Sequence, residues 1–205
     1  MVRARGAAQL SAPDAEELTY RSPGLQLVLE KISSGGKVNI LDLGPPLSAN
    51  VDFFSNYSCR LYIGDWLQSL PLANGVWGSA AEFSPLVSEV LELPESEKFD
   101  AIFCWDIVNY LNPESIRQFS RCLMQHCRSD ALCFFFVSTG KTMLAQPPRY
   151  RIIADDMLEF EPNDAGECSS PRFTQSKILE LMPEFQAHRS FLLQNGRQEQ
   201  ILKVR

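Results

Sequence analysis

The chain has 205 residues, enough for one domain with a single substantial core. Hydrophobic residues make up 45% and charged residues 21%, which excludes an intrinsically disordered chain. The net charge of −6 creates no positive field, so nucleic acid is not an expected partner. The longest apolar run, residues 131–137, is too short to span a bilayer, and the N-terminus lacks the apolar segment of a signal peptide. We therefore expect a cytoplasmic protein that has no membrane segment.

Residues 1–34 are predicted to form two helical pieces that pack on an α/β domain formed by residues 35–205. Ser11-Ala12-Pro13-Asp14 has the pattern of a capped helix start with an acidic first turn. Ser22-Pro23 begins a helix again, with proline at its first position. Apolar residues then recur at helical spacing over residues 25–32 until a glycine pair ends the segment.

Two apolar strands followed by a glycine turn and a carboxylate are the most informative pattern in the chain. The first strand, residues 38–43, runs into Gly44, and the second, residues 60–63, runs into Asp65, which lies 21 positions after Gly44. In Rossmann-like sites such a turn lets the backbone approach a nucleotide, and the acid at the next strand end accepts hydrogen bonds from a ribose. The pattern predicts a nucleotide-type site.

The rest of the chain alternates between predicted strands and helices. Residues 66–82 predict a short helix and a loop, and residues 83–90 a short strand. The runs 99–105 and 131–137 are nearly continuous in apolar residues, which is typical of strands covered on both faces. Asn112 with Pro113 begins a helix between these two strands. The alternation favours a Rossmann-like, doubly wound α/β fold with a mostly parallel sheet.

The C-terminal third begins with a segment of different composition. Residues 139–171 are rich in Pro, Gly, Asp and Glu, and we expect an irregular, mobile excursion of the kind that often forms a lid. Thr174 caps a short helix. Residues 185–193 and 198–204 then predict two strands, and Asn195-Gly196 between them is a strong hairpin signal. The fold is therefore expected to end in an antiparallel hairpin.

The cysteines and histidines do not predict a metal site. The six cysteines show no paired short spacing of the kind that zinc sites use. Cys122, His126 and Cys127 form the tightest cluster, but no fourth ligand is evident. We expect reduced cysteines and no bound metal.

The order of these elements resembles the class I S-adenosylmethionine-dependent methyltransferases over residues 24–205. The residues that carry the resemblance are Leu41-Asp42-Leu43-Gly44, Asp65, Leu93-Pro94 before Phe99-Asp100, and the terminal hairpin. The resemblance implies a seven-stranded sheet and S-adenosylmethionine as cofactor. It further implies that Asp42 and Gly44 stand in the cofactor-binding turn, and that Asp65 binds the ribose hydroxyls.

Further cofactor contacts follow from the same resemblance. Trp66 stands where an apolar residue commonly covers the adenine, and Glu89 where an acid often contacts it. Ser48 and Asn50 could contact the amino-acid end of the cofactor, and Trp105 lies at the edge where the cofactor would end. Four residues also have an ordinary structural interpretation: Asp42 as a turn cap, Asp65 as a strand-end acid, Trp66 as a packing side chain and Glu89 as a surface acid.

The turn departs from the family pattern at Pro45-Pro46, where glycine would be expected. Proline fixes φ near −65° and removes an N–H donor, whereas glycine admits positive φ and lets the backbone lie against a ligand. This change could lower or abolish cofactor affinity.

The acceptor would lie over the ends of the strands at 99–105 and 131–137. Asp106, Asn109 and Tyr110 follow the first of these and are candidates to orient or deprotonate an acceptor, while a turn-capping role for Asp106 is equally open. Methyl transfer needs mainly alignment, so the absence of a nucleophile–base pair does not count against an enzyme. The motif form resembles that of methyltransferases acting on small molecules.

Three functions remain open from the sequence. The leading interpretation is methyl transfer from S-adenosylmethionine to a small-molecule acceptor. The alternative is a catalytically inactive methyltransferase-like module that binds or regulates, for which Pro45-Pro46 is the motive. A nicotinamide oxidoreductase is disfavoured because the turn lacks Gly-x-Gly-x-x-Gly.

Overall fold

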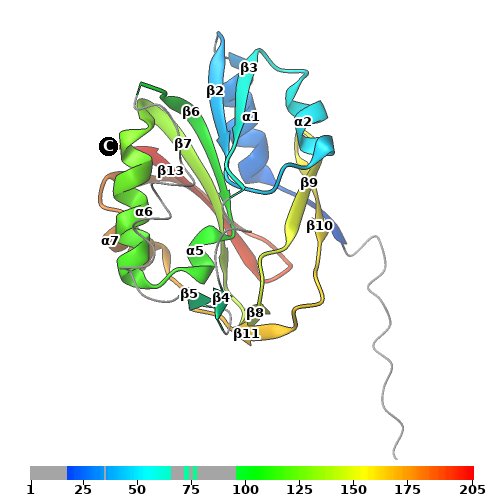
Figure 1. The fold of residues 1–205 in the computed structure, drawn as a ribbon, viewed down its shortest axis with the longest axis vertical. Coiled ribbons are helices and arrows are strands. Elements are labelled where there is room, and N and C mark those ends of the chain that lie inside the picture. Colours follow the sequence, from blue (N-terminus) through cyan, green and yellow to red (C-terminus); the bar gives the residue numbers. More distant parts are fainter. Residues whose placement is uncertain (1–17, 35, 66–71, 74–75, 78–95) are drawn as a thin grey trace, which may run out of the picture.

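The computed structural model describes residues 18–34, 36–65, 72–73, 76–77 and 96–205 (Figure 1). The predicted helix start at Ser11, the predicted strand at 83–90, and Trp66 and Glu89 lie outside these residues. Within the described residues no helix is long and apolar enough to cross a membrane. The same residues contain no group of three potential metal ligands.

A six-stranded mixed sheet forms the centre of the molecule. In spatial order its strands are β12 (Phe185–Leu192), β13 (Arg197–Val204), β7 (Cys127–Ser138), β6 (Phe99–Trp105), β2 (Val38–Asp42) and β3 (Cys59–Ile63). The four strands from β7 to β3 are parallel, and β13 pairs antiparallel with both of its neighbours, β7 and β12. The predicted α/β fold with a mostly parallel sheet and a C-terminal hairpin is confirmed, with six strands in this sheet where seven were expected.

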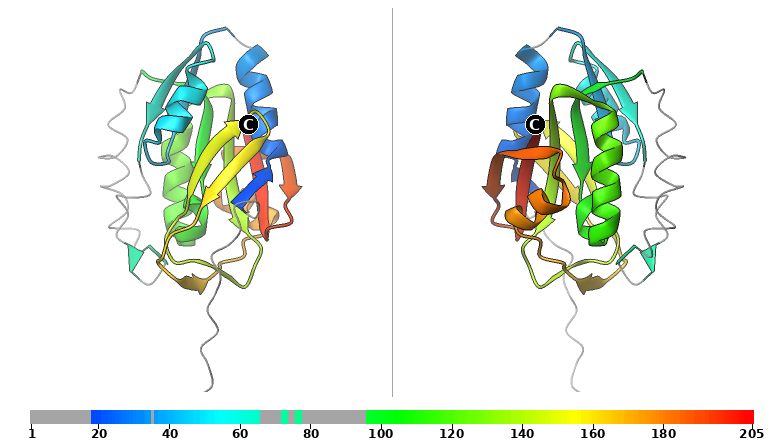
Figure 2. Two further views of the ribbon diagram at one scale, coloured as in Figure 1. Left: turned by 90° about the vertical axis from the view of Figure 1, so that its right-hand side faces the viewer. Right: turned by 90° about the vertical axis from the view of Figure 1, so that its left-hand side faces the viewer.

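Helices cover both faces of this sheet, which explains the continuous apolar runs of β6 and β7. On one side lie α6 (Pro113–Gln125) and α7 (Gln175–Leu181), and on the other lies α1 (Pro23–Ser34) (Figure 2). The expected caps are present: the Asn112 side chain accepts the amide of Ser115 at 2.9 Å, and Thr174 accepts that of Lys177 at 3.2 Å. These caps fix where α6 and α7 begin.

The prediction for residues 139–171 was wrong, because this segment forms four strands. They are β8 (Thr142–Leu144), β9 (Arg149–Ala154), β10 (Met157–Glu161) and β11 (Glu167–Ser169). Buried and exposed side chains alternate along β9 and β10. Tyr150, Ile152 and Leu158 are buried, while Arg151 on the outer face pairs with Glu159 and Glu161. In short strands with many charged residues, the alternation of apolar and polar residues is hard to recognise, so the polar composition predicted a loop.

Three smaller predictions also differ from the structure. Residues 19–21 form a strand, β1 (Thr19–Arg21), which pairs with β10, where a helical piece was expected. In the predicted helix and loop at 66–82, the described residues form β4 (Leu72–Ala73) and β5 (Val76–Trp77), a short antiparallel pair. In addition, β7 begins at Cys127, four residues before the predicted start of that strand. In the first case, pairing with a distant strand outweighs the local helical pattern.

Strands β1, β10 and β9 form a second, three-stranded antiparallel sheet. This sheet lies beside α2 (Ser48–Phe54) and on the side of the central sheet that α1 also covers (Figures 1 and 2). Its position brings β9 to the carboxyl ends of the central strands.

Candidate functional site

The topology of the sheet places a ligand crevice between β2 and β6. The chain moves outward from β2 to β3 and then returns to β6 on the other side of β2, so the strand order reverses at this point. In open α/β sheets ligands bind outside the carboxyl ends of the strands at such a switch point. Here those ends are Asp42 to Gly44 on β2 and Trp105 and Asp106 on β6.

The turn after β2 offers no free backbone donor at residues 44–47. The amide of Gly44 donates to Oδ1 of Asp42 at 2.8 Å. Pro45 and Pro46 have no N–H, and the amide of Leu47 donates back to the carbonyl of Pro45 at 2.8 Å. A turn that usually cradles a ligand with its amides is therefore satisfied within itself.

Trp105 occupies the space directly above this turn. A Cβ atom built on Gly44 would lie 2.7 Å from Nε1 of Trp105 and 3.0 Å from Oδ1 of Asp42. The indole donates to Oδ1 of Asp42 at 2.6 Å, and the Trp105 side chain is 2% exposed. Trp105 reaches this position with a left-handed φ of 48°, a backbone conformation that is unfavourable for a bulky residue.

Asp42 is a buried carboxylate that serves these internal contacts. Burial raises its pKa from 3.8 to about 6, against the hydrogen bonds from Trp105 and Gly44, which lower it. Both hydrogen-bond donors to this carboxylate, Trp105 and the amide of Gly44, thus belong to the protein itself.

Tyr150 closes the crevice from the side of β9. Its ring stacks on the indole of Trp105 at 5.2 Å between centroids and an interplanar angle of 10°, and on Phe136 at 4.8 Å. Its hydroxyl donates to Oδ2 of Asp106. The stack fills the space over the carboxyl end of β6 with buried aromatic surface.

Asn50 fastens β9 in this position. Its side-chain amide donates to the carbonyl of Tyr150 at 3.0 Å, and its Oδ1 accepts the amide of Ile152 at 2.9 Å. Asn50 is 3% exposed, so both of its polar atoms are committed to β9. The residue predicted to touch a cofactor holds a strand of the protein instead.

The remaining predicted cofactor residues lie at the open side of the crevice. Asp65 is half-buried at the end of β3 and has a left-handed φ of 37°. Partial burial raises the pKa of Asp65, and the charge of Arg149 on β9 opposes this shift. Ser48 is exposed at the start of α2. These two residues are more exposed than the buried group of Asp42, Asn50 and Trp105, although the charge of Asp65 still contributes to the raised pKa of Asp42.

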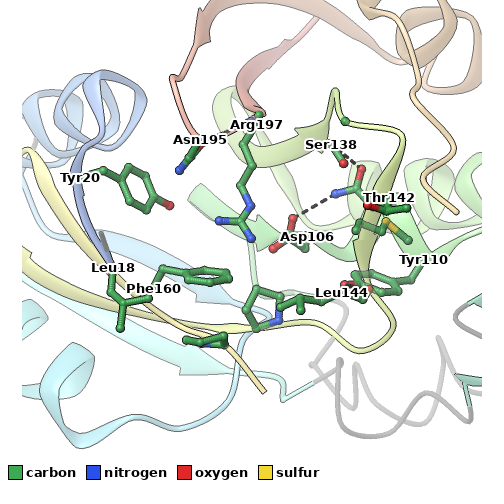
Figure 3. A pocket seen from close by; sticks show the side chains of 16 residues that line it. Leu18, Tyr20, Asp106, Tyr110, Ser138, Thr142, Leu144, Phe160, Asn195 and Arg197 are labelled. Atoms are coloured by element: carbon green, nitrogen blue, oxygen red, sulfur yellow. Dashed lines mark hydrogen bonds between the residues drawn. The ribbon is translucent and has the colours of Figure 1, made fainter. Parts of the chain in front are cut away.

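The predicted acceptor residues Asp106, Asn109 and Tyr110 lie together and line one cavity (Figure 3). Nδ2 of Asn109 donates to Asp106 and to the carbonyl of Phe136, both at 3.0 Å, and Oδ1 of Asn109 accepts the amide of Ser138. Asn109 is therefore fully used in holding α5 (Ile107–Tyr110) to β7.

Asp106 and Tyr110 are also committed to internal hydrogen bonds. Burial raises the pKa of Asp106, while the charge of Arg197 and the hydrogen bonds from Tyr150 and Asn109 lower it. The hydroxyl of Tyr110 donates to the carbonyl of Leu144 at 2.9 Å.

Sequence reasoning missed Tyr150 and Arg197. Tyr150 lies in the segment interpreted as a loop, and Arg197 lies just after the Asn-Gly turn that was used only as a hairpin signal. The guanidinium of Arg197 lies 4.0 Å from the ring centroid of Phe160 and 5.7 Å from that of Tyr150. The available signal was the position of Arg197, which is the first residue of the strand β13 and not part of the exposed turn before it.

Comparison with solved structures identifies the fold. The chain matches an S-adenosylmethionine-dependent methyltransferase from Clostridium acetobutylicum with a TM-score of 0.52 and 11% identity, over 94% of this chain and 92% of that one. The chain has the fold of the class I methyltransferases. No protein-family model matches the sequence, and a search of curated proteins finds no match.

Two further solved structures are similar. The pyocyanin biosynthetic protein PhzM matches with a TM-score of 0.50 and 12% identity, over 93% of this chain and 56% of that one. A 1,6-didemethyltoxoflavin-N1-methyltransferase from Burkholderia thailandensis, solved with its substrate and S-adenosylhomocysteine, matches with a TM-score of 0.49 and 14% identity, over 89% and 79% of the chains. At these identities the likeness concerns the fold.

The residues of this chain do not fit the amino-acid end of S-adenosylmethionine. That end would need open space and backbone donors against Gly44, and Trp105 fills the space while the amide of Gly44 is already used. Among the described residues predicted to bind the cofactor, Asp65 keeps the partial exposure and the strand-end position that a ribose contact requires. The disagreement is therefore confined to the crevice between β2 and β6.

Proposed function

We propose that this chain is a binding module with the methyltransferase fold that does not transfer methyl groups. One observation carries the proposal: the indole of Trp105, held by Asp42, occupies the space above Gly44. The methyl-transfer step needs the donor and acceptor aligned at the carboxyl ends of β2 and β6. A crevice filled by the protein's own side chains leaves no room for that alignment.

Three further features support a permanent closure. Pro45 and Pro46 remove two donors from the turn. Tyr150 stacks on Trp105, and Asn50 holds the backbone of β9 at the carbonyl of Tyr150 and the amide of Ile152. To open the crevice, several buried hydrogen bonds and a stacked aromatic pair would have to be broken together, which would cost several kcal/mol.

The second candidate function is methyl transfer from S-adenosylmethionine to a small-molecule acceptor. Asp65 favours it, because a half-buried carboxylate stands at the end of β3, 21 positions after Gly44. In that function Asp65 would bind the ribose, and Asp106 and Tyr110 would orient the acceptor. This candidate requires β9 and Trp105 to move away from the turn.

Thermal melting with S-adenosylhomocysteine separates the two functions. A ligand present at about a hundred times its dissociation constant stabilises a fold by about 2.7 kcal/mol, which raises the melting temperature of a chain of this length by about 5 to 10 °C. We expect no shift for the wild-type protein at a ligand concentration of about 1 mM. The sample is first unfolded and refolded so that no copurified ligand remains.

The Asp65→Ala variant makes the result specific. A shift in the wild type that disappears in Asp65→Ala would contradict the binding-module proposal and support the methyltransferase. In a matched experiment the Trp105→Ala, Pro46→Gly double variant tests the cause of closure, since it clears the space above Gly44 and restores one N–H.

A further inference from the structure

A second cavity lies beside the closed crevice and has a volume of about 370 Å³. Its walls come from β1, α5, the end of β7, β8, β10 and the turn between β12 and β13 (Figure 3). Cavities of this size hold small organic ligands. Tyr150 and Asp106 lie between this cavity and the crevice, so the cavity exists while the crevice is filled.

Arg197 is the cation of this cavity. Figure 3 shows its side chain directed between Tyr20 and Asp106, above the ring of Phe160. Among the described residues it forms no ion pair, although other arginines such as Arg21 and Arg151 do. The Asp106 carboxylate acts on Arg197 through its charge, but no direct ion pair satisfies the mostly buried guanidinium among the described residues, which leaves N–H donors for a ligand.

A hydroxyl donor lies next to the guanidinium. The Tyr20 hydroxyl is buried, and apart from its interaction with the Arg197 side chain it has no hydrogen-bond partner among the described residues. Burial raises the pKa of Tyr20 above its usual range, against the opposing charge of Arg197, so the phenol keeps its proton. A planar guanidinium and a phenol side by side suit a ligand that accepts several hydrogen bonds.

The charges of the walls favour a ligand with no more than one negative charge. Arg197 and Asp106 are the lining residues that carry formal charges. Both oxygens of Asp106 already accept hydrogen bonds, from Asn109 and from Tyr150. A dianionic phosphate would meet one cation and a nearby carboxylate, whereas a carboxylate matches the single guanidinium fork.

The other walls are apolar. Phe160, Met143, Leu144 and Pro148 line the cavity, with Phe160 directly beside the guanidinium of Arg197. A ligand that fits both ends has an acidic head and a short apolar or aromatic body.

We propose that this cavity binds a small monocarboxylate, with its carboxylate on Arg197 and Tyr20 and its apolar body against Phe160. The proposal names the ligand class of the binding module and in that respect rests on the proposed function. Binding of a monocarboxylate in this cavity does not require the crevice between β2 and β6 to open. Each of the two proposals is therefore tested by its own experiment. A rise in melting temperature with S-adenosylhomocysteine would overturn the binding-module proposal and would leave the benzoate titration described below unaffected.

The test is an amide and arginine side-chain NMR titration of the full chain with benzoate. Benzamide, which has the same shape without the charge, and phenyl phosphate serve as comparison probes. We expect benzoate to shift the signals of Asn195, Gly196 and the Nε–H of Arg197. Benzamide should bind at least about tenfold more weakly, because it cannot form the charge-assisted pair.

Two variants locate the site. Arg197→Gln should weaken benzoate binding on the order of ten- to a hundredfold and leave benzamide binding unchanged. Arg189→Gln removes the same charge from the exposed face of β12 and should bind benzoate like the wild type. Tyr20→Phe keeps the ring and should weaken benzoate binding several-fold, which tests the site even where Arg197→Gln does not fold.

Several results would overturn the proposal. These are equal binding of benzoate and benzamide by the wild type, no binding of benzoate, or tighter binding of phenyl phosphate. Unchanged benzoate affinity in Tyr20→Phe, or in folded Arg197→Gln, would do the same.

Discussion

The indole nitrogen of Trp105 lies 2.6 Å from Oδ1 of Asp42, the same oxygen that accepts the amide of Gly44 at 2.8 Å. The carboxylate that would begin a cofactor turn is therefore neutralised in part by two donors of its own chain. Because the group is buried, losing either donor leaves an unsatisfied charge rather than a solvated one.

Trp105→Phe should destabilise the protein by about 1.5 to 3 kcal/mol at pH 8, since it removes a hydrogen bond to a buried carboxylate. At pH 5 the loss should be smaller, because the raised pKa of Asp42, about 6, leaves the group largely protonated there. Urea unfolding at both pH values measures this. The double variant Trp105→Phe, Asp42→Asn is the control, and equal losses with and without Asp42 would show that the hydrogen bond is unimportant.

Asn50→Ala should destabilise the protein by about 2 to 4 kcal/mol, because it leaves the carbonyl of Tyr150 and the amide of Ile152 buried without their hydrogen-bond partner. Amide hydrogen exchange should become faster at Ile152 and remain slow in β2. Asn56→Ala is the matched control, since Asn56 is exposed and bonds only within its own turn. Unchanged exchange at Ile152 would contradict the fastening role of Asn50.

Tyr150→Phe keeps the stack on Trp105 but removes the donor to Asp106. We expect a loss of about 1.5 to 3 kcal/mol, because the acceptor is a buried carboxylate. Tyr57→Phe removes the 2.9 Å hydrogen bond to Asp155 at the surface and should cost less than about 1 kcal/mol. Similar losses in the two variants, measured by urea unfolding, would argue against a tightly closed crevice.

Glu199 should make the protein less stable as the pH rises. The carboxyl group is fully buried, accepts hydrogen bonds from Ser22 and the amide of Gly24, and has a pKa raised by burial from 4.5 to about 7. The folded state therefore binds this proton more tightly than the unfolded state does. Its contribution is greatest below pH 4.5 and is lost as the pH rises through 7.

Glu199→Gln should remove about 3 kcal/mol of this pH dependence between pH 4.5 and pH 8, on the scale of 1.36 kcal/mol per pKa unit. Unfolding free energies measured across that range for both proteins provide the test. Glu184→Gln serves as the control, because Glu184 is half-buried and accepts from Ser120 at 2.5 Å at the edge of the fold. Parallel stability curves for wild type and Glu199→Gln would contradict the assignment.

The fold was predictable where local signals and long periodicity agree. Pro23, Asn112 and Thr174 mark helix starts through cap chemistry that acts within one turn, and the structure places α1, α6 and α7 at these residues. Asn195-Gly196 marks the C-terminal hairpin for the same local reason, and Gly196 has a positive φ of 74°.

The site was less predictable, because its decisive contacts join distant parts of the chain. Asp42, Trp105 and Asp106 were found at the strand ends and Asn50 after the first turn, but their partners lie elsewhere. The indole of Trp105 reaches 63 positions to Asp42, and Asn50 reaches 102 to Ile152. A pattern of residues shows which side chains reach the crevice. It does not show whether a ligand or another strand of the same protein fills it.

The pairing of β1 with β10 also has a consequence for how the protein folds. Arg21 and Asp156, which form an ion pair at 2.5 Å, are separated by 135 positions. Contacts of such long range are slow to form, because a large loop must close before they contribute. During synthesis β1 emerges first but has to wait for β10, so we expect the strands that seal the crevice to assemble in the last phase of folding. A nascent chain that stops before residue 149 would carry the central parallel strands with their carboxyl ends still uncovered.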